Sequence, residues 1–261
     1  MKVVIFAGGL GTRLSEETRI MPKPMVEING RPILWHIMKI YSHYGFNEFV
    51  ICCGYKGDMI KEYFSNYFLR YSDVSFDFRD GNSSFTTHKQ PPEKWKVTLV
   101  DTGLNTQTAG RLERVKEYID TNNFFLTYGD GVADININHL LKFHEQNKKI
   151  ATVTAVQPLG RFGALDINGG LVSNFVEKPT GERGWINGGF FVLNKKVFDY
   201  LPENSEDVMW EQEPMKNLAT DGELSAYKHE GFWQPMDTLR EKHILEKMAV
   251  NKQAPWVMWN D

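Results

Sequence analysis

Cysteine is scarce in this chain of 261 residues, and the two that occur exclude several kinds of site. Cys52 and Cys53 are neighbours in the apolar run at 49–53, and neighbouring side chains of a strand point to opposite faces. We therefore expect two buried free thiols in a reducing compartment rather than a structural disulfide. Neither cysteine stands in a metal-ligand spacing, so the pair predicts no metal site.

Long apolar runs and a strong excess of charge are also lacking. No apolar segment is long enough to cross a bilayer, and the chain opens on a predicted strand rather than on a signal peptide. The formal net charge of −3 gives no overall attraction to nucleic acid or to anionic membranes. We expect a soluble cytoplasmic protein with no nucleic-acid partner and no membrane partner, in which any affinity for phosphate is local.

Internal repeats, low-complexity segments and convincing linkers are missing too, while hydrophobic residues make up 41% of the sequence, enough for a substantial core. We predict a single α/β domain over 1–261. Strands alternate with helices at the start, which predicts a parallel sheet with ligands at the carboxyl ends of its strands. The expected strands are 2–7, 48–53, 97–101, 124–128, 151–156, 223–229 and 232–234. The expected helices are 32–41, 58–68, 110–118, 137–147 and 238–248, with one more beginning within 210–215.

One segment, at about 69–96, breaks this pattern with aromatic, Ser/Thr and Pro-containing sequence. We interpret it as an irregular or β-hairpin insertion. Its aromatic residues are candidates for an oligomer contact or for a lid, and the sequence leaves both open.

The most informative stretch is 1–30, and within it the loop that follows the first strand. Gly8, Gly9 and Gly11 let the backbone turn sharply and present its N–H groups to a ligand. Two cations follow, Arg13 and Lys23, the second between two prolines. Because arginine matches phosphate oxygens with a planar fork and lysine supplies a movable charge, the stretch predicts a site for a nucleoside triphosphate.

This loop matches neither the Walker A spacing nor the Gly-x-Gly-x-x-Gly run of dinucleotide folds. The motif Gly-Gly-Leu-Gly-Thr-Arg-Leu at 8–14, then Thr18, then Pro-Lys-Pro-Met at 22–25, resembles the signature of the sugar-1-phosphate nucleotidylyltransferases. The resemblance implies a three-layer, Rossmann-like α/β fold with a mostly parallel mixed central sheet and a β-rich insertion. It also implies the nucleotide-binding residues Phe6, Ala7, Gly8, Gly9, Leu10, Gly11, Thr12, Arg13, Lys23, Thr106, Arg111, Tyr128 and Gly129.

A second glycine-containing loop, at 102–112, opens a predicted helix near Gly110, so its amides and Arg111 are candidates for contact with the phosphates or the base. Its sequence resembles that of the family members that make CDP-glucose. The partners implied are CTP and glucose 1-phosphate.

Two aspartates are candidate metal ligands. Asp130 stands between two glycines after an apolar strand, where one carboxylate and substrate phosphates could hold Mg²⁺; a plain turn is the alternative. The resemblance makes Asp237 the second ligand, and a helix N-cap is the alternative there. Asp134 is a weaker candidate ligand, and we expect it to cap the helix at 137–147.

The sugar-binding part is expected at about 151–237. By the resemblance, Glu177 of Glu-Lys-Pro contacts the sugar, Lys178 binds its phosphate, and Asn187 and Gly188 line the sugar with Gly163. The acidic residues of 211–213 receive no chemical role.

Taken together, the resemblance implies transfer of a cytidylyl group from CTP to glucose 1-phosphate, with Mg²⁺ as cofactor and Arg13, Lys23 and Asp130 as catalytic residues. The resemblance also implies a homo-oligomer, with a hexamer as the suspected form. Two alternatives stay open: the same reaction with dTTP or UTP, and a non-catalytic sensor of nucleotide sugars.

Overall fold

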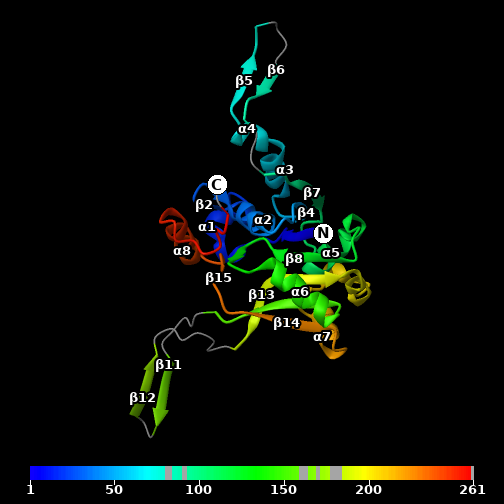
Figure 1. Cartoon of the computed structure of the whole chain (residues 1–261), viewed down its shortest axis with the longest axis vertical. Coiled ribbons are helices and arrows are strands. Elements are labelled where there is room, and N and C mark those ends of the chain that lie inside the picture. The colour runs from blue at the N-terminus through cyan, green and yellow to red at the C-terminus, as the bar shows by residue number, and fades with distance from the viewer. Residues whose placement is uncertain (80–83, 90–92, 159–163, 169–170, 177–183, 260–261) are drawn as a thin grey trace.

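A computed structural model describes residues 1–79, 84–89, 93–158, 164–168, 171–176 and 184–259 (Figure 1). Its centre is a seven-stranded sheet in the order β14-β10-β13-β8-β1-β4-β7. Every neighbouring pair is parallel except the two made by β13, which runs antiparallel to β10 and to β8. The predicted mostly parallel mixed sheet is thus confirmed. Its strands are β1 (Lys2–Ala7), β4 (Glu48–Cys53), β7 (Lys96–Asp101), β8 (Asn123–Tyr128), β10 (Ala151–Val156), β13 (Ile186–Asn194) and β14 (Leu224–His229).

Helices cover both faces of this sheet, because alternate side chains of its strands feed two separate cores. Val3 and Ile5 of β1 belong to one core, and Val4 and Phe6 belong to the other. The first core is closed by α2 (Ile33–His43), α3 (Gly57–Ser65), α6 (Ile137–Asn147) and α8 (Leu239–Val250). The second is closed by α5 (Thr108–Arg114), α7 (Glu213–Thr220) and the 3-10 helix η4 (Lys195–Tyr200). The result is the three-layer arrangement that the sequence predicts.

Two predicted helices differ from the observed ones. The helix expected at 58–68 is divided at Asn66 into α3 and α4 (Tyr67–Tyr71), because Asn66 leaves helical geometry at φ −98° and ψ 9°. The turn brings Tyr67 against Trp35, whose indole N–H donates to the Tyr67 hydroxyl at 3.1 Å. The helix expected at 110–118 begins earlier, at Thr108, and tightens after Arg114 into the 3-10 turn η3 (Lys116–Tyr118).

The expected cap at Asp134 was wrong, and the cap considered as an alternative role for Asp237 is not observed. Asn136, not Asp134, caps α6, since its side chain accepts from the backbone N–H of His139 at 2.9 Å. Asp134 instead lies 3.0 Å from the imidazole of His229. At the start of α8 the N-cap is Thr238, in a reciprocal capping box with Glu241, so Asp237 does not cap this helix.

The remaining strands form short pairs: β2 (Glu27–Ile28) with β3 (Arg31–Pro32), β5 (Val74–Asp77) with β6 (Ser84–Thr87), β9 (Gly131–Ala133) with β15 (Trp233–Pro235), and β11 (Ala164–Asn168) with β12 (Leu171–Val176). The short helices η1 (Thr12–Leu14), α1 (Ser15–Thr18), η2 (Lys23–Met25) and η5 (Ser205–Asp207) complete the described elements.

The hairpin β5–β6 extends beyond α4, away from the central sheet (Figure 1). Its aromatic residues Phe76, Phe78 and Phe85 are exposed. Trp95, from the same stretch of sequence, packs instead on Phe49 with ring centroids 5.8 Å apart. Within the described ranges, no helix combines the length and the apolar character that a membrane crossing requires.

Candidate active site at the carboxyl ends of the strands

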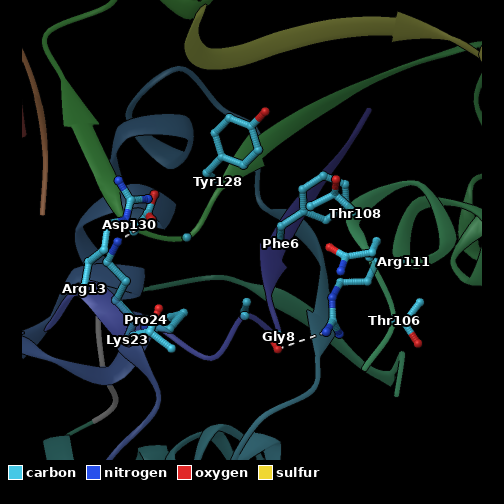
Figure 2. Close-up of a pocket in the computed structure, with 16 residues that line it drawn as sticks. Phe6, Gly8, Arg13, Lys23, Pro24, Thr106, Thr108, Arg111, Tyr128 and Asp130 are labelled. Carbon is cyan, nitrogen blue, oxygen red and sulfur yellow. Dashed lines mark hydrogen bonds and ion pairs between the residues drawn. The ribbon is translucent and has the colours of Figure 1, made fainter. Parts of the chain in front are cut away.

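A cleft of about 280 Å³ opens at the carboxyl ends of β1 and β8, where a parallel sheet normally binds its ligands (Figure 2). Arg13, Lys23 and Asp130 lie on one side of the glycine loop, and Arg111 and Thr106 lie on the other. Of the predicted nucleotide-binding residues, all but Leu10 line the cleft. The full lining is Phe6, Ala7, Gly8, Gly9, Gly11, Thr12, Arg13, Lys23, Pro24, Thr106, Gln107, Thr108, Arg111, Tyr128, Gly129 and Asp130.

The three glycines of the loop have different surroundings. A Cβ on Gly8 would lie 2.1 Å from the guanidinium of Arg111, so this glycine makes room for a side chain of the protein itself. Gly11 has φ +64°, in the left-handed region that favours glycine. A Cβ on Gly9 would meet no described atom within 4 Å. Gly9 lines the cleft with open space beside it, and that space is available to a ligand.

Arg111 is buried and holds the loops of the cleft together. Its Nη2 donates to the carbonyl of Gly8 after β1 at 3.0 Å, and its Nη1 donates to Gly103 O at 2.9 Å and Thr102 Oγ1 at 2.7 Å after β7. A longer bond of 3.3 Å reaches Cys53 O, at the end of β4. Because these terminal N–H groups are directed at the protein, Arg111 ties the ends of three strands together. Its predicted contact with nucleotide stays a prediction.

Lys23 lies between the two aspartates that the sequence proposes as metal ligands. Its ammonium is 2.7 Å from Asp130 Oδ2 and 2.6 Å from Asp237 Oδ1. Arg13, which is largely exposed, pairs with the other oxygen of Asp237 at 2.7 Å. Burial lowers the pKa of Lys23, but the charges and hydrogen bonds of Asp130 and Asp237 outweigh it and raise the pKa above the ordinary value. Lys23 is therefore charged at neutral pH.

The pairing of β9 with β15 brings these two aspartates together from distant parts of the chain. Asp130 immediately precedes β9, Asp237 follows β15, and Gly131 is paired with Pro235. The N–H of Met236 donates to the carbonyl of Asp130 at 2.8 Å. The N–H of Asp237 in turn donates to the carboxylate of Glu241 at 2.8 Å, which ties Asp237 to the start of α8.

The donor set at this point suits a hard divalent cation. Two carboxylate oxygens already converge on one positive charge, and Mg²⁺ is commonly held by one or two carboxylates together with substrate phosphates. Among the described residues, no group of three or more His, Cys, Asp or Glu side chains comes together as a complete metal cage. The pair Asp130 and Asp237 is thus the donor set that fits a metal shared with a phosphate ligand.

The predicted sugar-binding residues are only partly within the described ranges. Asn187 lies beside the cleft, since its side-chain amide donates to the hydroxyl of Tyr128 at 3.2 Å. The carbonyl of Gly188 accepts from the indole of Trp233 at 2.7 Å. Gly163, Glu177 and Lys178 lie outside the residues whose side chains the structure describes.

Three polar residues of the site, Gln107, Thr108 and Glu211, are missing from the sequence prediction. Thr108 lines the cleft at the first turn of α5, and its hydroxyl donates to Glu211 Oε2 at 2.9 Å. Glu211, just before α7, also accepts from the hydroxyl of Tyr128. No local pattern could have identified Glu211, because its partners lie 83 and 103 residues away in the sequence.

Comparison with known proteins places this geometry in context. The family model "Nucleotidyl transferase" matches residues 2–261. Glucose-1-phosphate cytidylyltransferase of Salmonella typhimurium is 57% identical over 99% of this chain and 100% of its own length. A probable glucose-1-phosphate cytidylyltransferase of Bacillus subtilis is 48% identical, also over 99% of this chain and 100% of its own. The crystal structure of HddC from Yersinia pseudotuberculosis superposes with a TM-score of 0.69 at 23% identity, covering 95% of this chain and 99% of that one.

Proposed function

The chain belongs to the nucleotidyl transferase family, and on that premise we propose that it transfers the cytidylyl group of CTP to glucose 1-phosphate, giving CDP-glucose and pyrophosphate. The observation that carries the proposal is the 57% identity, over nearly the whole of both chains, with a protein named for this activity. The cleft supports it, because it combines backbone amides of a glycine loop with two cations and two carboxylates.

The reaction asks for positioning and charge rather than for a protein nucleophile. An oxygen of the sugar phosphate attacks the α-phosphorus of CTP in line, the new P–O bond forms, and the bond to the bridging oxygen breaks, so that pyrophosphate leaves with the electron pair. We assign Arg13 and Lys23 to the negative charge that grows on the pyrophosphate. By the family resemblance, Lys178 holds the attacking phosphate.

Nucleotidyl transferases of this family typically use a divalent metal ion. For this chain we propose Mg²⁺, with Asp130 and Asp237 as the protein ligands. When bound, the ion supplies positive charge to the nucleotide phosphates. Lys23, whose ammonium now lies between the two carboxylates, would then turn to the phosphates of the leaving group.

The whole chain, 1–261, is proposed to act as one domain, with the sugar bound by its part at 151–237. We also propose a cytoplasmic homo-oligomer, with the hexamer as the expected form. Support comes from Phe76, Phe78 and Phe85, which are exposed on the β5–β6 hairpin that extends away from the central sheet. A monomer in light scattering at micromolar concentration would contradict the oligomer.

The decisive test is pyrophosphate release with glucose 1-phosphate and Mg²⁺, with CTP, UTP, dTTP, ATP and GTP supplied in separate reactions. We expect a strong preference for CTP. Preference for dTTP or UTP would keep the chemistry and change the nucleotide. Binding of nucleotide sugar in calorimetry without release of pyrophosphate from any of the five would favour a sensor.

A further inference from the structure

A chain of hydrogen bonds crosses the site from the nucleotide side to the sugar side, and Glu211 is at its centre. One carboxylate oxygen of Glu211 accepts from Thr108, which lines the cleft on α5. The other accepts from the hydroxyl of Tyr128, which lines the cleft at the end of β8. The Tyr128 hydroxyl accepts in turn from the amide of Asn187 on β13 at 3.2 Å.

The direction of each hydrogen bond follows from the chemistry of the carboxylate. An ionised carboxylate only accepts, so Tyr128 must give its single hydroxyl proton to Glu211. The phenol oxygen can then only accept from its other neighbour, which requires Asn187 to present its amide nitrogen there. That orientation turns the amide oxygen of Asn187 toward the backbone N–H of Gly189, which donates to it at 2.8 Å. Glu211, acting through Tyr128, and the N–H of Gly189 thus favour the same orientation of the Asn187 amide.

The same logic holds on the other side of Glu211. Thr108 gives its hydroxyl proton to Glu211, and its oxygen accepts from the backbone N–H of Trp210 at 2.7 Å. Trp210 is fully buried, so this bond anchors the segment that carries Glu211 to the start of α5. The carboxylate is therefore held by the fold before any ligand enters.

Packing leaves Tyr128 little freedom to choose another partner. Its ring lies edge-on to Phe191, with centroids 6.0 Å apart, and 6.1 Å from Phe6. A Cβ on Gly189 would lie 2.6 Å from the ring, and Gly189 has φ +81°, so only glycine lets the backbone approach the tyrosine ring this closely. The packed ring therefore keeps the phenol hydroxyl directed at Glu211.

We propose that Glu211 is a positioning residue: anchored by Thr108, it acts through Tyr128 to fix the orientation of Asn187, and so presents one defined amide N–H to the sugar phosphate. The inference rests on the proposed function, because it assigns the sugar side of the cleft to Asn187. It adds a residue to which the sequence analysis gave no chemical role.

The first test reads the network without any turnover. A phenol hydroxyl that donates to a carboxylate should give a slowly exchanging downfield proton signal in NMR, assigned to Tyr128 by its loss in Tyr128→Phe. With Glu211→Gln, which keeps the side-chain volume, we expect this signal to move upfield or vanish, because the charged acceptor is gone. Glu213→Gln is the matched control, since Glu213 is exposed two positions further on and should leave the signal unchanged. An unchanged signal in Glu211→Gln would overturn the network.

The second test is a double-mutant cycle on the steady-state rates. Glu211→Ala should lower kcat/KM for glucose 1-phosphate roughly ten- to a hundredfold, the effect of losing one hydrogen bond to a charged group. Most of the loss should appear in KM for the sugar phosphate, with little change in KM for CTP. In the Tyr128→Phe background the same substitution should have a much smaller effect, because the group through which it acts is already missing. If Glu211→Ala does not fold, Glu211→Gln replaces it in the double-mutant cycle.

The outcomes separate the two proposals. Additive effects of Glu211→Ala and Tyr128→Phe, or equal rises in both KM values, would refute the positioning role even if the proton signal of Tyr128 moves. Absence of turnover by the unchanged protein with CTP and glucose 1-phosphate would refute the proposed function, while the proton signal would still decide whether Glu211 holds Tyr128.

Discussion

Replacement of Lys23 by methionine tests the central charge arrangement of the site. The change removes the ammonium and leaves the carboxylates of Asp130 and Asp237 facing each other without the cation they share. The side chain of Lys23 is 9% exposed, that of Asp237 17% and that of Asp130 32%. In exposure the cluster is therefore intermediate between two kinds of ion pair. Disruption of a buried ion pair costs about 3–5 kcal/mol, whereas a surface ion pair contributes about 0–1 kcal/mol to stability.

From these exposures we expect Lys23→Met to lower the free energy of unfolding by about 1–3 kcal/mol in the absence of metal. For a chain of this size, each kcal/mol corresponds to a fall in Tm of about 2–4 °C. Mg²⁺ alone should restore much of this loss, because a ligand that binds only the folded state stabilises it. Turnover should still fall at least about a hundredfold, since a charge aimed at the transition state is missing.

The assay is Tm by scanning fluorimetry with and without Mg²⁺, for the unchanged protein, Lys23→Met and Lys242→Met. Lys242 is a matched control, because its partly exposed ion pair with Glu17 involves neither of the two aspartates. We expect Mg²⁺ to raise Tm most in Lys23→Met and to leave Lys242→Met no more responsive than the unchanged protein. The same response in all three proteins would refute the reasoning that Lys23 occupies the space between two metal ligands.

Three further predictions concern Asp130, Arg111 and His144. Asp130→Asn should shift the Mg²⁺ dependence of the rate to higher concentration, and an unchanged Mg²⁺ titration would place the metal elsewhere. Arg111→Met should destabilise the fold by about 3–5 kcal/mol, because buried carbonyls lose a charged donor; a smaller loss of Tm than in Arg13→Met, whose replaced side chain is 72% exposed, would contradict this. Burial lowers the pKa of His144, so the unfolded chain takes up the proton first and stability should fall as the pH drops below about 6.5. Tm measured against pH should show a shallower fall in His144→Gln, and an identical profile would exclude His144 as its source.

Many elements of the fold could be predicted from the sequence because their signals are local. The strand at 48–53, the helix at 137–147 and the strand at 151–156 have the bounds that hydrophobic periodicity predicts. A predicted helix was misplaced where a distant contact competes with the local signal, since Asn66 divides it as Tyr67 packs on Trp35. The caps Asn136 and Thr238 are local, and they leave Asp134 and Asp237 to other partners.

The site shows the same division between what is local and what is not. Contiguous motifs were sufficient to propose Lys23 and Asp130, and the family resemblance added Asp237. Their joint position depends on β9 pairing with β15, a contact between segments about a hundred residues apart that leaves no periodic trace in the sequence. The roles proposed for these residues stay predictions until the variants are measured.

By itself, the sequence determined the class of fold, the family and the loop that opens the cleft, because strand periodicity, glycine spacing and neighbouring cations are all encoded within short windows. Only the tertiary structure decided that the terminal N–H groups of Arg111 donate to carbonyls at the ends of three strands. It also decided that Glu211 accepts from Tyr128 and so orients the hydrogen bonds around that residue. The physical reason is that a buried polar group takes its partners from whatever segments the fold brings within about 3 Å, and partners such as Gly8 for Arg111 and Tyr128 for Glu211 lie far away along the chain.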